Sequence, residues 1–367
     1  KALRRMDNEL AEKHGQFSLS LCCLRKRKRL EMKIGLSYDL KEEVTLDQEH
    51  PEDALEEYDS LETVDNIAAA LEYLGHSVVK LSGGRKFLTN ILQSDVDFVF
   101  NISEGRGNYR SREAQIPAIL EMLDIAYSGS DPQCLAVSLD KPLTKKLVQA
   151  AGICTPRWQV VSDRREMEKV CQDSFPLPAF IKPAFEGSSK GIRLGCRVED
   201  SEQMARVTAA ILKQYQQPVM VEEFISGDEV TVGVVGNSPP QIVGIMRILP
   251  KKRSSNFVYS LEVKRDWQNQ VDYECPAQLE AKVLKKIADF SLRAFDTLGC
   301  RDFARLDFRL DQKGMPCFLE INPLPGLNPK SSDLPILAYK MGWNYRGLIS
   351  SVLNAALERY PEHRGAH

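Results

Sequence analysis

The chain has 367 residues, of which 43% are hydrophobic, and its 49 basic and 51 acidic side chains nearly cancel. This size and apolar content support a large core or several packed lobes. The balanced charge excludes the positive field with which a protein holds nucleic acid nonspecifically, so we expect no nucleic-acid partner. No stretch approaches the roughly 20 apolar residues that cross a bilayer, and we expect no membrane partner.

The first 31 residues are interpreted as a disordered extension. An apolar run at residues 17–24 precedes a basic run at 25–29, which reverses the order found in a secretory signal. A nuclear-localisation or nucleic-acid-binding role for the basic run is the alternative. The nine cysteines lack the spacing of a zinc site, and we interpret them as reduced thiols of a cytoplasmic protein.

Residues 32–152 predict an open α/β lobe. Residues 32–37 have the pattern of a buried strand, and the acidic stretch that follows, through Tyr58, is predicted to be a surface loop. Apolar residues at helical spacing between Ser60, the predicted N-cap, and Gly75 predict a helix. Strands at 77–81 and 97–102 alternate with helical segments, which is typical of a parallel sheet.

Residues 153–235 predict a central α+β lobe, and residues 236–360 predict a C-terminal lobe. Strands are expected at 178–182, 219–225, 229–235 and 241–249. A charged, irregular stretch at 250–273 is a candidate mobile loop. A long helix at 277–298 then leads to paired strands at 302–310 and 317–321 and to two final helices.

Four polar residues mark the last pair of strands. Arg305 and Asp307 lie two apart on one strand, and Glu320 and Asn322 lie two apart on the other, so each couple shares a face. Magnesium ions prefer oxygen ligands from one or two carboxylates together with substrate phosphates. The pattern therefore indicates a metal and phosphate site. A solvated face with ordinary salt bridges is the alternative.

Lys182 ends a predicted strand and precedes a loop rich in glycine and serine at residues 186–191. The backbone amides and hydroxyls of such a loop bind phosphate, and the lysine adds a positive charge. A plain hairpin connection is the alternative, because the loop lacks the Gly-Lys-Ser/Thr run of a P-loop.

The apolar strand at 219–225 ends in two acids followed by two apolar residues. Strand ends of this type offer backbone groups and apolar surface to adenine, and Glu229 offers a carboxylate to ribose hydroxyls. An edge strand with solvated acids is the alternative.

In this order, the elements resemble those of the ATP-grasp ligases and, among them, of the D-alanine–D-alanine ligase family, over residues 32–360. The matching stretches are residues 125–130, 138–141, 181–189, 222–225, 304–307 and 319–326. The ordered set is far more specific than any single stretch. The resemblance implies an ATP-grasp fold with an N-terminal Rossmann-like lobe, and a homodimer.

The resemblance also implies roles for the site residues. The ATP phosphates are expected to contact Lys141 and Lys182 under the loop of Glu186, Ser188 and Ser189. Adenine and ribose are expected to contact Glu222, Glu223, Phe224, Ile225 and Glu229. Two magnesium ions, with manganese as the alternative, are expected to bind Asp307, Glu320 and Asn322. The implied catalytic groups are Arg305 and the amide of Gly326 for the oxyanion, Lys264 for the γ-phosphate, and Ser188.

The chain departs from the family where substrates are recognised. One of the acids at 42–43 is expected to replace a family glutamate that holds the first substrate's ammonium. Glu104 lies in a segment that replaces the family's His-Gly, and Arg265 replaces a tyrosine. Ser331 and Ser332 are the expected contacts for a substrate carboxylate.

The implied function is the joining of two amino acids with ATP and magnesium. ATP converts a carboxylate to an acyl phosphate, which a second amino acid's amine attacks. The product is D-alanyl-D-alanine for peptidoglycan or another dipeptide. Two alternatives stay open, a nucleotide-binding protein without ligase activity and a ligase with a thiol or hydroxyl acceptor.

Overall fold

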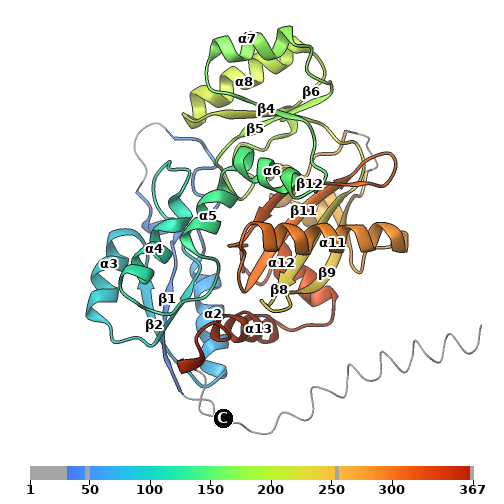
Figure 1. Cartoon of the computed structure of the whole chain (residues 1–367). Helices are drawn as coiled ribbons and strands as arrows, with labels where there is room; N and C mark the ends of the chain where they lie inside the picture. The colour runs from blue at the N-terminus through green and yellow to red at the C-terminus, as the bar shows by residue number, and fades with distance from the viewer. Residues whose placement is uncertain (1–30, 46–49, 253–255, 364–367) are drawn as a thin grey trace, which may run out of the picture.

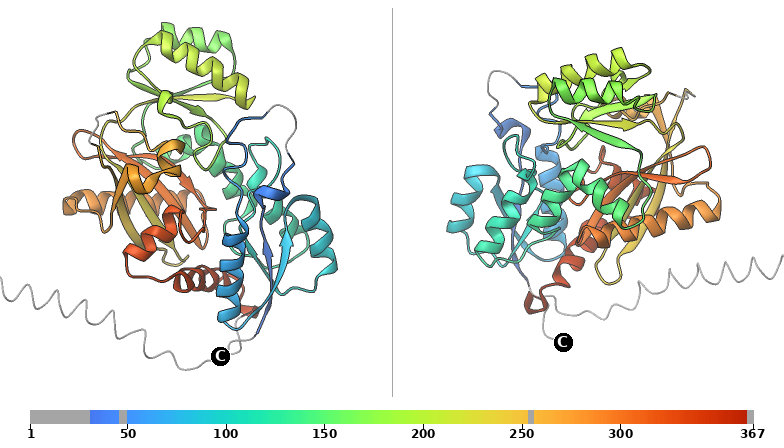
Figure 2. Two further views of the ribbon diagram at one scale, coloured as in Figure 1. Left: turned by 180° about the vertical axis from the view of Figure 1, so that it is seen from behind. Right: turned by 45° about the horizontal axis from the view of Figure 1, so that its top comes forward.

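The computed structural model describes residues 31–45, 50–252 and 256–363, and the predicted extension lies outside them apart from Glu31. Three lobes, each built on one β-sheet, meet around a common centre (Figure 1). Figure 2 shows the same arrangement from behind and with its top brought forward. The mixed α/β architecture that the sequence predicts is confirmed.

The N-terminal lobe holds a parallel sheet in the order β2-β1-β3. Its strands are β1 Lys33–Ser37, β2 Ser77–Ser82 and β3 Phe98–Asn101. Its helices are η2 Lys41–Glu43, α2 Leu61–Tyr73, α3 Gly84–Gln93, η3 Arg112–Ala114, α4 Gln115–Met122, α5 Pro132–Leu139 and α6 Lys141–Ala150. The Ser60 hydroxyl accepts a hydrogen bond from the amide of Thr63, and Gly75 follows α2 with φ +91°, so both predicted helix ends are confirmed.

The predicted surface loop before α2 is wrong. Asp53, Glu57 and Tyr58 are buried. Asp53 accepts hydrogen bonds from the hydroxyl of Tyr215 at 2.8 Å and from the amide of Gly191 at 2.9 Å, both in the central lobe. Acidic residues are usually exposed, but burial is tolerated where partners satisfy them. Here the partners lie 162 and 138 residues away along the chain, beyond the reach of any local pattern.

The central lobe holds an antiparallel sheet in the order β4-β7-β5-β6. Its strands are β4 Trp158–Val161, β5 Ala179–Pro183, β6 Arg197–Val198 and β7 Val219–Glu223, with η4 Leu194–Cys196 before β6. Helices α7 Arg164–Gln172 and α8 Ser201–Tyr215 cover one face, at the top of Figure 1. Ile181 and Val221 pack against Met204 on that side. The alternate residues Lys182 and Glu222 therefore point to the opposite face.

The C-terminal lobe holds a five-stranded sheet in the order β10-β9-β8-β11-β12. Its strands are β8 Glu229–Val235, β9 Gln241–Pro250, β10 Val271–Glu274, β11 Phe303–Leu310 and β12 Pro316–Asn322. Helix α11 Ala281–Thr297 covers one face, where Ile287 and Phe290 pack against Val232 and Leu306. Alternation along the strands leaves polar side chains on the other face, toward the central lobe.

The division of the chain into three units stays a prediction. The order of the strands in the sheets, however, does not fit a boundary between the second and third units at residue 235. The sequence places β8 at the end of the central unit, which closes at residue 235. In the structure β8 lies between β9 and β11, so the change of sheet falls between β7 and β8. The hydrophobic pattern of a strand does not show which strand it pairs with, because pairing depends on the tertiary structure.

The stretch at 250–273, predicted to be irregular and mobile, contains regular structure in its described part. It holds α9 Leu261–Arg265, α10 Trp267–Gln270 and the start of β10. Leu261 and Val263 are buried, and β10 pairs with β9. The prediction is wrong for these elements because helices of one turn are too short to show a hydrophobic period.

The helices after β12 form the C-terminal end of the described chain. They are α12 Asp333–Lys340, α13 Tyr345–Leu357 and η5 Pro361–His363. Helix α13 lies beside α2 in both figures, and Ile349 and Val352 share a core with Val64 and Ile67. Helix α13 therefore connects the C-terminal lobe with the N-terminal lobe through this shared core. Among the helices of the described residues, none has the length and apolar character needed to cross a membrane.

Candidate active site

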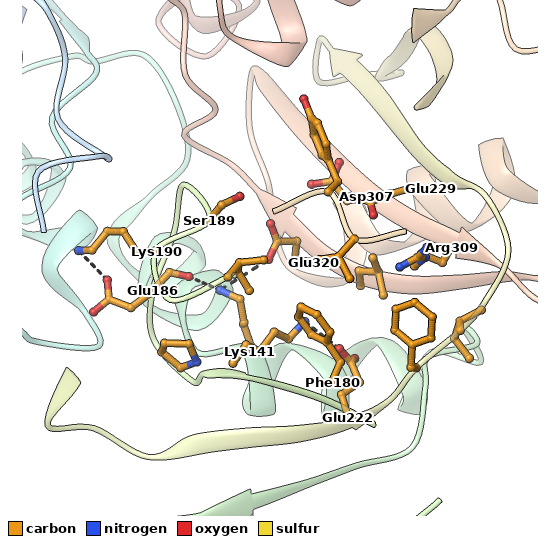
Figure 3. Close-up of a pocket in the computed structure, with 18 of the residues that line it drawn as sticks. Lys141, Phe180, Glu186, Ser189, Lys190, Glu222, Glu229, Asp307, Arg309 and Glu320 are labelled. Atoms are coloured by element: carbon orange, nitrogen blue, oxygen red, sulfur yellow. Dashed lines mark hydrogen bonds and ion pairs between the residues drawn. The ribbon is translucent and has the colours of Figure 1, made fainter. Parts of the chain in front are cut away.

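A cleft between the central and C-terminal sheets forms what we call the first cavity (Figure 3). Its central wall carries Phe180 and Lys182 from β5 and Glu222 from β7. Its C-terminal wall carries Asp307 from β11 and Glu320 from β12. One end is charged and the other apolar, as a nucleotide site requires.

Two more cavities adjoin the first. The second cavity shares Lys141 and Glu320 with it, and the third cavity, of about 450 Å³, shares Lys264 with it. Arg305 and Gly326 line both the second and the third cavity. A molecule in the first cavity can therefore reach a molecule in the third through the second.

Strands β11 and β12 bring the four predicted polar residues together. Asp307 lies opposite Glu320, and Arg305 lies opposite Asn322. A register shift after Asp307 leaves Leu319 without a counterpart, so Leu319 and Glu320 both line the first cavity. This bulge was not apparent from the sequence, and it adds an apolar side chain beside the carboxylate.

The donor set at this point fits a hard divalent cation. Burial raises the pKa of Asp307, although Arg305 opposes the shift. Burial would also raise the pKa of Glu320, but Lys141 and Lys182 lower it to about 2. Asn322 donates from its amide nitrogen to Glu320 at 3.5 Å, which leaves its amide oxygen for a cation.

No group of three or more His, Cys, Asp or Glu side chains in the described residues could hold a metal alone. Two carboxylates and an amide suit magnesium, because magnesium keeps few protein ligands and takes others from substrate phosphates.

Two lysines flank the Glu222 carboxylate. Lys182 lies 2.8 Å from it, and Lys145 forms a second ion pair with it. Burial would lower the pKa of Lys182, but Glu222 raises it above the usual value. Glu222 therefore orients Lys182, and its predicted adenine and ribose contact stays a prediction. Sequence reasoning missed Lys145; its spacing of four from Lys141 along α6 was the available signal.

The predicted phosphate loop lies over the same cavity. Ser188 and Ser189 have φ of 48° and 61°, so consecutive residues adopt the left-handed region that turns backbone amides inward. Ser189 lines the first cavity, and Ser188 lines the other two. Lys141 donates to the carbonyl oxygen of Glu186 and lies 3.6 Å from Glu320 (Figure 3).

The Glu186 carboxylate is already satisfied. It accepts from Gln217 at 2.6 Å and pairs with Lys190 at 2.7 Å and Arg112 at 3.1 Å. Glu186 lines the first and second cavities, yet its side chain holds the loop in place. Its predicted nucleotide contact stays a prediction. Lys190 and Arg112 were missed, since their partners are distant in sequence.

The apolar end of the first cavity contains Phe180, Phe224 and Ile225. The centre of the Phe224 ring lies 4.7 Å from the guanidinium of Arg197 and 4.6 Å from that of Arg309. Glu223, also predicted, lines the cavity at the end of β7. The end of the cavity therefore offers an aromatic surface of fixed orientation.

Lys264 comes from α9 and reaches the space between the first and third cavities. Its ammonium lies 3.9 Å from Asp333 and 4.8 Å from the centre of the Tyr259 ring. These contacts hold the lysine near the charged end of the first cavity, and its contact with the γ-phosphate stays a prediction.

The third cavity contains the predicted substrate residues. Glu104, Ser331 and Ser332 line it. The Ser332 hydroxyl accepts from the amide of Asn328 at 3.0 Å, and the amide of Ser331 donates to the side chain of Asn328 at 3.1 Å. These hydrogen bonds do not involve the side-chain hydroxyl of Ser331, so this hydroxyl is available to a substrate.

Besides Glu104, the acids that face the third cavity are different from the predicted ones. Glu43 accepts from Ser82 at 2.6 Å and from Lys86 at 2.9 Å, and it lines none of the three cavities, so its predicted substrate contact is wrong. Glu56 and Glu57, from the segment expected to be a surface loop, line the third cavity instead, together with Asp59 just after it. Arg265, in the position of a family tyrosine, pairs with Glu56 at 2.5 Å and Glu52 at 3.0 Å.

Enclosure in the cleft raises the pKa of Glu229 to about 7, with Arg309 opposing the shift. Because the folded state then holds this proton more tightly than the unfolded chain, stability is expected to fall as the pH rises from about 4.5 to about 7. Glu229→Gln removes this contribution. Unfolding of wild type and variant at pH 5 and pH 8 measures it: the variant should gain relative to wild type at pH 8. Parallel curves would contradict the raised pKa.

The chain is similar to proteins of one family. The family model for the D-ala D-ala ligase C-terminus matches residues 147–354. The D-alanine–D-alanine ligase of Aquifex aeolicus is 35% identical over 295 residues, which cover 80% of this chain and 94% of the relative. The uncharacterized protein y4sG of Sinorhizobium fredii is 32% identical, over 81% of this chain and 88% of its own length.

Solved structures share the fold. The D-alanine–D-alanine ligase from Bacillus anthracis complexed with ATP has a TM-score of 0.67 at 22% identity, covering 90% of this chain and 99% of that one. The VanG D-Ala:D-Ser ligase from Enterococcus faecalis has a TM-score of 0.68 at 20% identity, covering 89% and 99%.

The three sheets share the fold of D-alanine–D-alanine ligase structures, which is the ATP-grasp fold. The chain belongs to the D-alanine–D-alanine ligase family. It is therefore an enzyme that forms a peptide bond at the expense of ATP.

Proposed function

We propose that this ligase joins two small amino acids, with D-alanine as the first candidate for both. The observation that carries the proposal is the convergence of Arg305, Asp307, Glu320 and Asn322 where the first and second cavities meet. The nucleotide occupies the first cavity, and the amino acids occupy the second and third. D-alanine is favoured because relatives such as the Aquifex aeolicus protein are named D-alanine–D-alanine ligases.

Each wall of the first cavity has a role in holding ATP. Lys141 and Lys182 bind the phosphates under the loop of Ser188 and Ser189. Phe224 gives adenine an aromatic surface. Lys264 contacts the γ-phosphate from the other side of the cavity. When bound at Asp307, Glu320 and Asn322, two magnesium ions or manganese ions neutralise charge on the transferring phosphoryl group.

The second cavity is the place of bond formation. The carboxylate of the first amino acid accepts the phosphoryl group there and becomes an acyl phosphate. The amine of the second amino acid attacks it, and phosphate leaves. Arg305 and the amide of Gly326 line this cavity and stabilise the oxyanion of the tetrahedral intermediate. Ser188 and Lys264 keep water away from the acyl phosphate.

A substrate panel tests the function. Purified protein is incubated with ATP, magnesium chloride and pairs of D- and L-amino acids, and phosphate release and product mass are measured. We expect phosphate release that depends on the amino acids and a product mass equal to two amino acids less one water. An ester or thioester product would overturn the amine acceptor. ATP binding without turnover for every amino acid would overturn the proposal.

Removal of the metal is expected to stop turnover. Excess EDTA should bring phosphate release below detection, because the transferring phosphoryl group loses its charge neutralisation. Magnesium chloride added back should restore it, with manganese chloride as a second test. The control is the far-ultraviolet circular dichroism spectrum, which should not change with EDTA. Turnover that persists in EDTA would contradict the assignment of Asp307, Glu320 and Asn322.

The assembly and location are part of the same proposal. We propose a homodimer in the cytoplasm, which serves peptidoglycan synthesis if the product is D-alanyl-D-alanine. The seven cysteines in the described part of the chain are all free thiols, as a reducing compartment favours. Light scattering coupled to size exclusion measures the oligomeric state, and a mass of one chain would overturn the dimer.

A further inference from the structure

Two cysteines from distant parts of the chain lie next to each other at a boundary between lobes. Cys154 lies in the link between α6 and β4, and Cys317 lies near the start of β12. Their sulfur atoms are 3.6 Å apart, although 163 residues separate them along the chain. Cys154 is half-buried, and Cys317 is buried. The pair therefore combines one residue that is partly open to solvent with a second thiol directly beside it.

Hydrogen bonds on both sides hold the two sulfur atoms together. The amide of Phe318, the neighbour of Cys317, donates to the carbonyl oxygen of Cys154 at 2.7 Å. The hydroxyl of Thr155, the neighbour of Cys154, donates to the carbonyl oxygen of Phe318 at 2.9 Å. A disulfide bond has sulfur atoms about 2.0 Å apart, so the two sulfurs need to approach by about 1.6 Å. Small rotations of both side chains can supply this approach.

The two thiols differ in reactivity. The hydrogen bond with Cys317 lowers the pKa of Cys154 to about 7, against the influence of burial. The same hydrogen bond raises the pKa of Cys317, and burial raises it further. The thiolate is the nucleophilic form of cysteine. Cys154, which is also the more exposed of the two, is therefore the residue that an oxidant attacks first.

The position of this pair connects it to the nucleotide site. Lys145 donates to the hydroxyl of Thr155, the neighbour of Cys154, at 2.7 Å, and it pairs with Glu222. Glu222 in turn orients Lys182. On the other side of the pair, β12 carries two of the proposed metal ligands. A covalent bond between the link and β12 therefore joins the supports of both walls of the first cavity.

We propose that Cys154 and Cys317 form a modification site, a dithiol that a peroxide oxidises reversibly to a disulfide, which slows the use of ATP. Disulfides in a reducing compartment are usually transient and redox-sensing, which suits a pair of this kind. The disulfide restrains the link against β12, while the entry of ATP and the release of ADP require the walls of the first cavity to separate. The effect on turnover rests on the proposed function, whereas the formation of the bond does not.

The oxidation balances with hydrogen peroxide as the oxidant. The Cys154 thiolate attacks one peroxide oxygen, the O–O bond breaks, hydroxide leaves, and a sulfenic acid forms. The Cys317 thiol then attacks the Cys154 sulfur. An S–S bond forms, the S–O bond breaks, and the hydroxyl group leaves as water with the proton of Cys317. The two thiols together lose two electrons, and the peroxide gains them. Dithiothreitol reverses the reaction by thiol–disulfide exchange.

A second pair of thiols provides an internal control. The sulfur atoms of Cys134 and Cys300 are also 3.6 Å apart, but both residues are buried. Burial raises the pKa of Cys300 well above its usual value. A peroxide has to reach a thiolate to react, so this pair should stay reduced under conditions that oxidise Cys154 and Cys317.

The test treats the full chain with hydrogen peroxide, blocks the remaining thiols with iodoacetamide, and locates any disulfide by peptide mass spectrometry. Phosphate release and the Kd for ATP are measured in the reduced protein, after oxidation and after dithiothreitol. The variants are Cys154→Ser and Cys317→Ser. Cys171→Ser is the matched control, because Cys171 is also half-buried but donates to the carbonyl oxygen of Ser201 and contacts no other thiol of the described residues. Thermal unfolding confirms that each variant is folded.

We expect a linkage between Cys154 and Cys317 in the oxidised wild type and in Cys171→Ser. In both proteins kcat/KM for ATP should fall about threefold or more and recover with dithiothreitol, while oxidation should leave it unchanged in Cys154→Ser and Cys317→Ser.

The absence of this linkage, or the same loss on oxidation in Cys154→Ser, would overturn the modification site. A linkage that leaves both kcat/KM and the Kd for ATP unchanged would overturn its effect on the use of ATP. A reduced wild type that binds ATP but never releases phosphate would overturn the proposed function alone, because the linkage and the Kd for ATP still report on the thiol pair.

Discussion

Replacing Arg305 by glutamine is expected to lower kcat by about 10²–10³-fold, with a much smaller change in the KM for ATP. The guanidinium lies 2.9 Å from Asp307, 3.4 Å from Asp333 and 3.7 Å from Glu320. It also lines the two cavities in which the reacting carbonyl is proposed to lie. A donor that meets charge only as it develops stabilises the transition state more than the ground state.

Two variants make this result specific. Arg305→Lys keeps the charge but loses the planar fork, so it should recover only part of the activity. Arg164→Gln, at a position 89% exposed on α7, should leave kcat unchanged. Steady-state phosphate release with the best amino-acid pair gives kcat, at a temperature below the Tm of every variant. A kcat for Arg305→Gln close to that of the wild type would contradict the oxyanion role.

Glu57→Gln is expected to lower the free energy of unfolding by about 3 kcal/mol. The Glu57 carboxylate lies 2.6 Å from Arg112 and 3.0 Å from Lys190, and all three side chains are buried. Loss of its charge leaves two buried cations that, among the described residues, share ion pairs with Glu186 alone. Because Lys190 belongs to the loop over the nucleotide, the KM for ATP should rise as well.

The pH dependence follows from the same ion pairs. Burial would raise the pKa of Glu57, but Arg112 and Lys190 lower it below its usual value. Its contribution to stability is therefore present above the unfolded pKa of about 4.5 and is lost as the pH falls through the folded value. The difference between wild type and Glu57→Gln should narrow in acid.

Glu168→Gln is the matched control for Glu57→Gln. Glu168 pairs with Arg164 at 3.0 Å on the exposed surface of α7, so its loss should cost less than about 1 kcal/mol. Denaturant unfolding at pH 7.5 and pH 4 measures both variants. Equal destabilisation by the two substitutions would contradict a structural role for the buried ion pairs.

The structure confirms the placement of residues that was predicted from strand periodicity. The alternation of Arg305, Asp307, Glu320 and Asn322 indicates one shared face, and the observed register brings them together. The N-cap at Ser60 and the helix end at Gly75 are equally local features, and both are confirmed. Local backbone geometry decides such features, so a short window of sequence contains the information.

The predictions that failed concern charged residues with distant partners. The acidic segment before α2 was expected in solvent, but Asp53 and Glu57 are buried against the central lobe. One of Glu42 and Glu43 was expected at the substrate, but neither lines the three cavities, and Glu43 accepts hydrogen bonds from Ser82 and Lys86. Whether a carboxylate is exposed, paired or free depends on groups that only folding brings near it.

The sequence by itself determined the ligase machinery, because its residues lie on strands and turns whose geometry is set by their neighbours. Only the tertiary structure decided which acids surround the amino-acid substrate. It satisfied Glu57, Glu186 and Glu222 with buried cations. The physical reason is that a buried charge is governed by its counter-charges, and in this chain those come from other lobes.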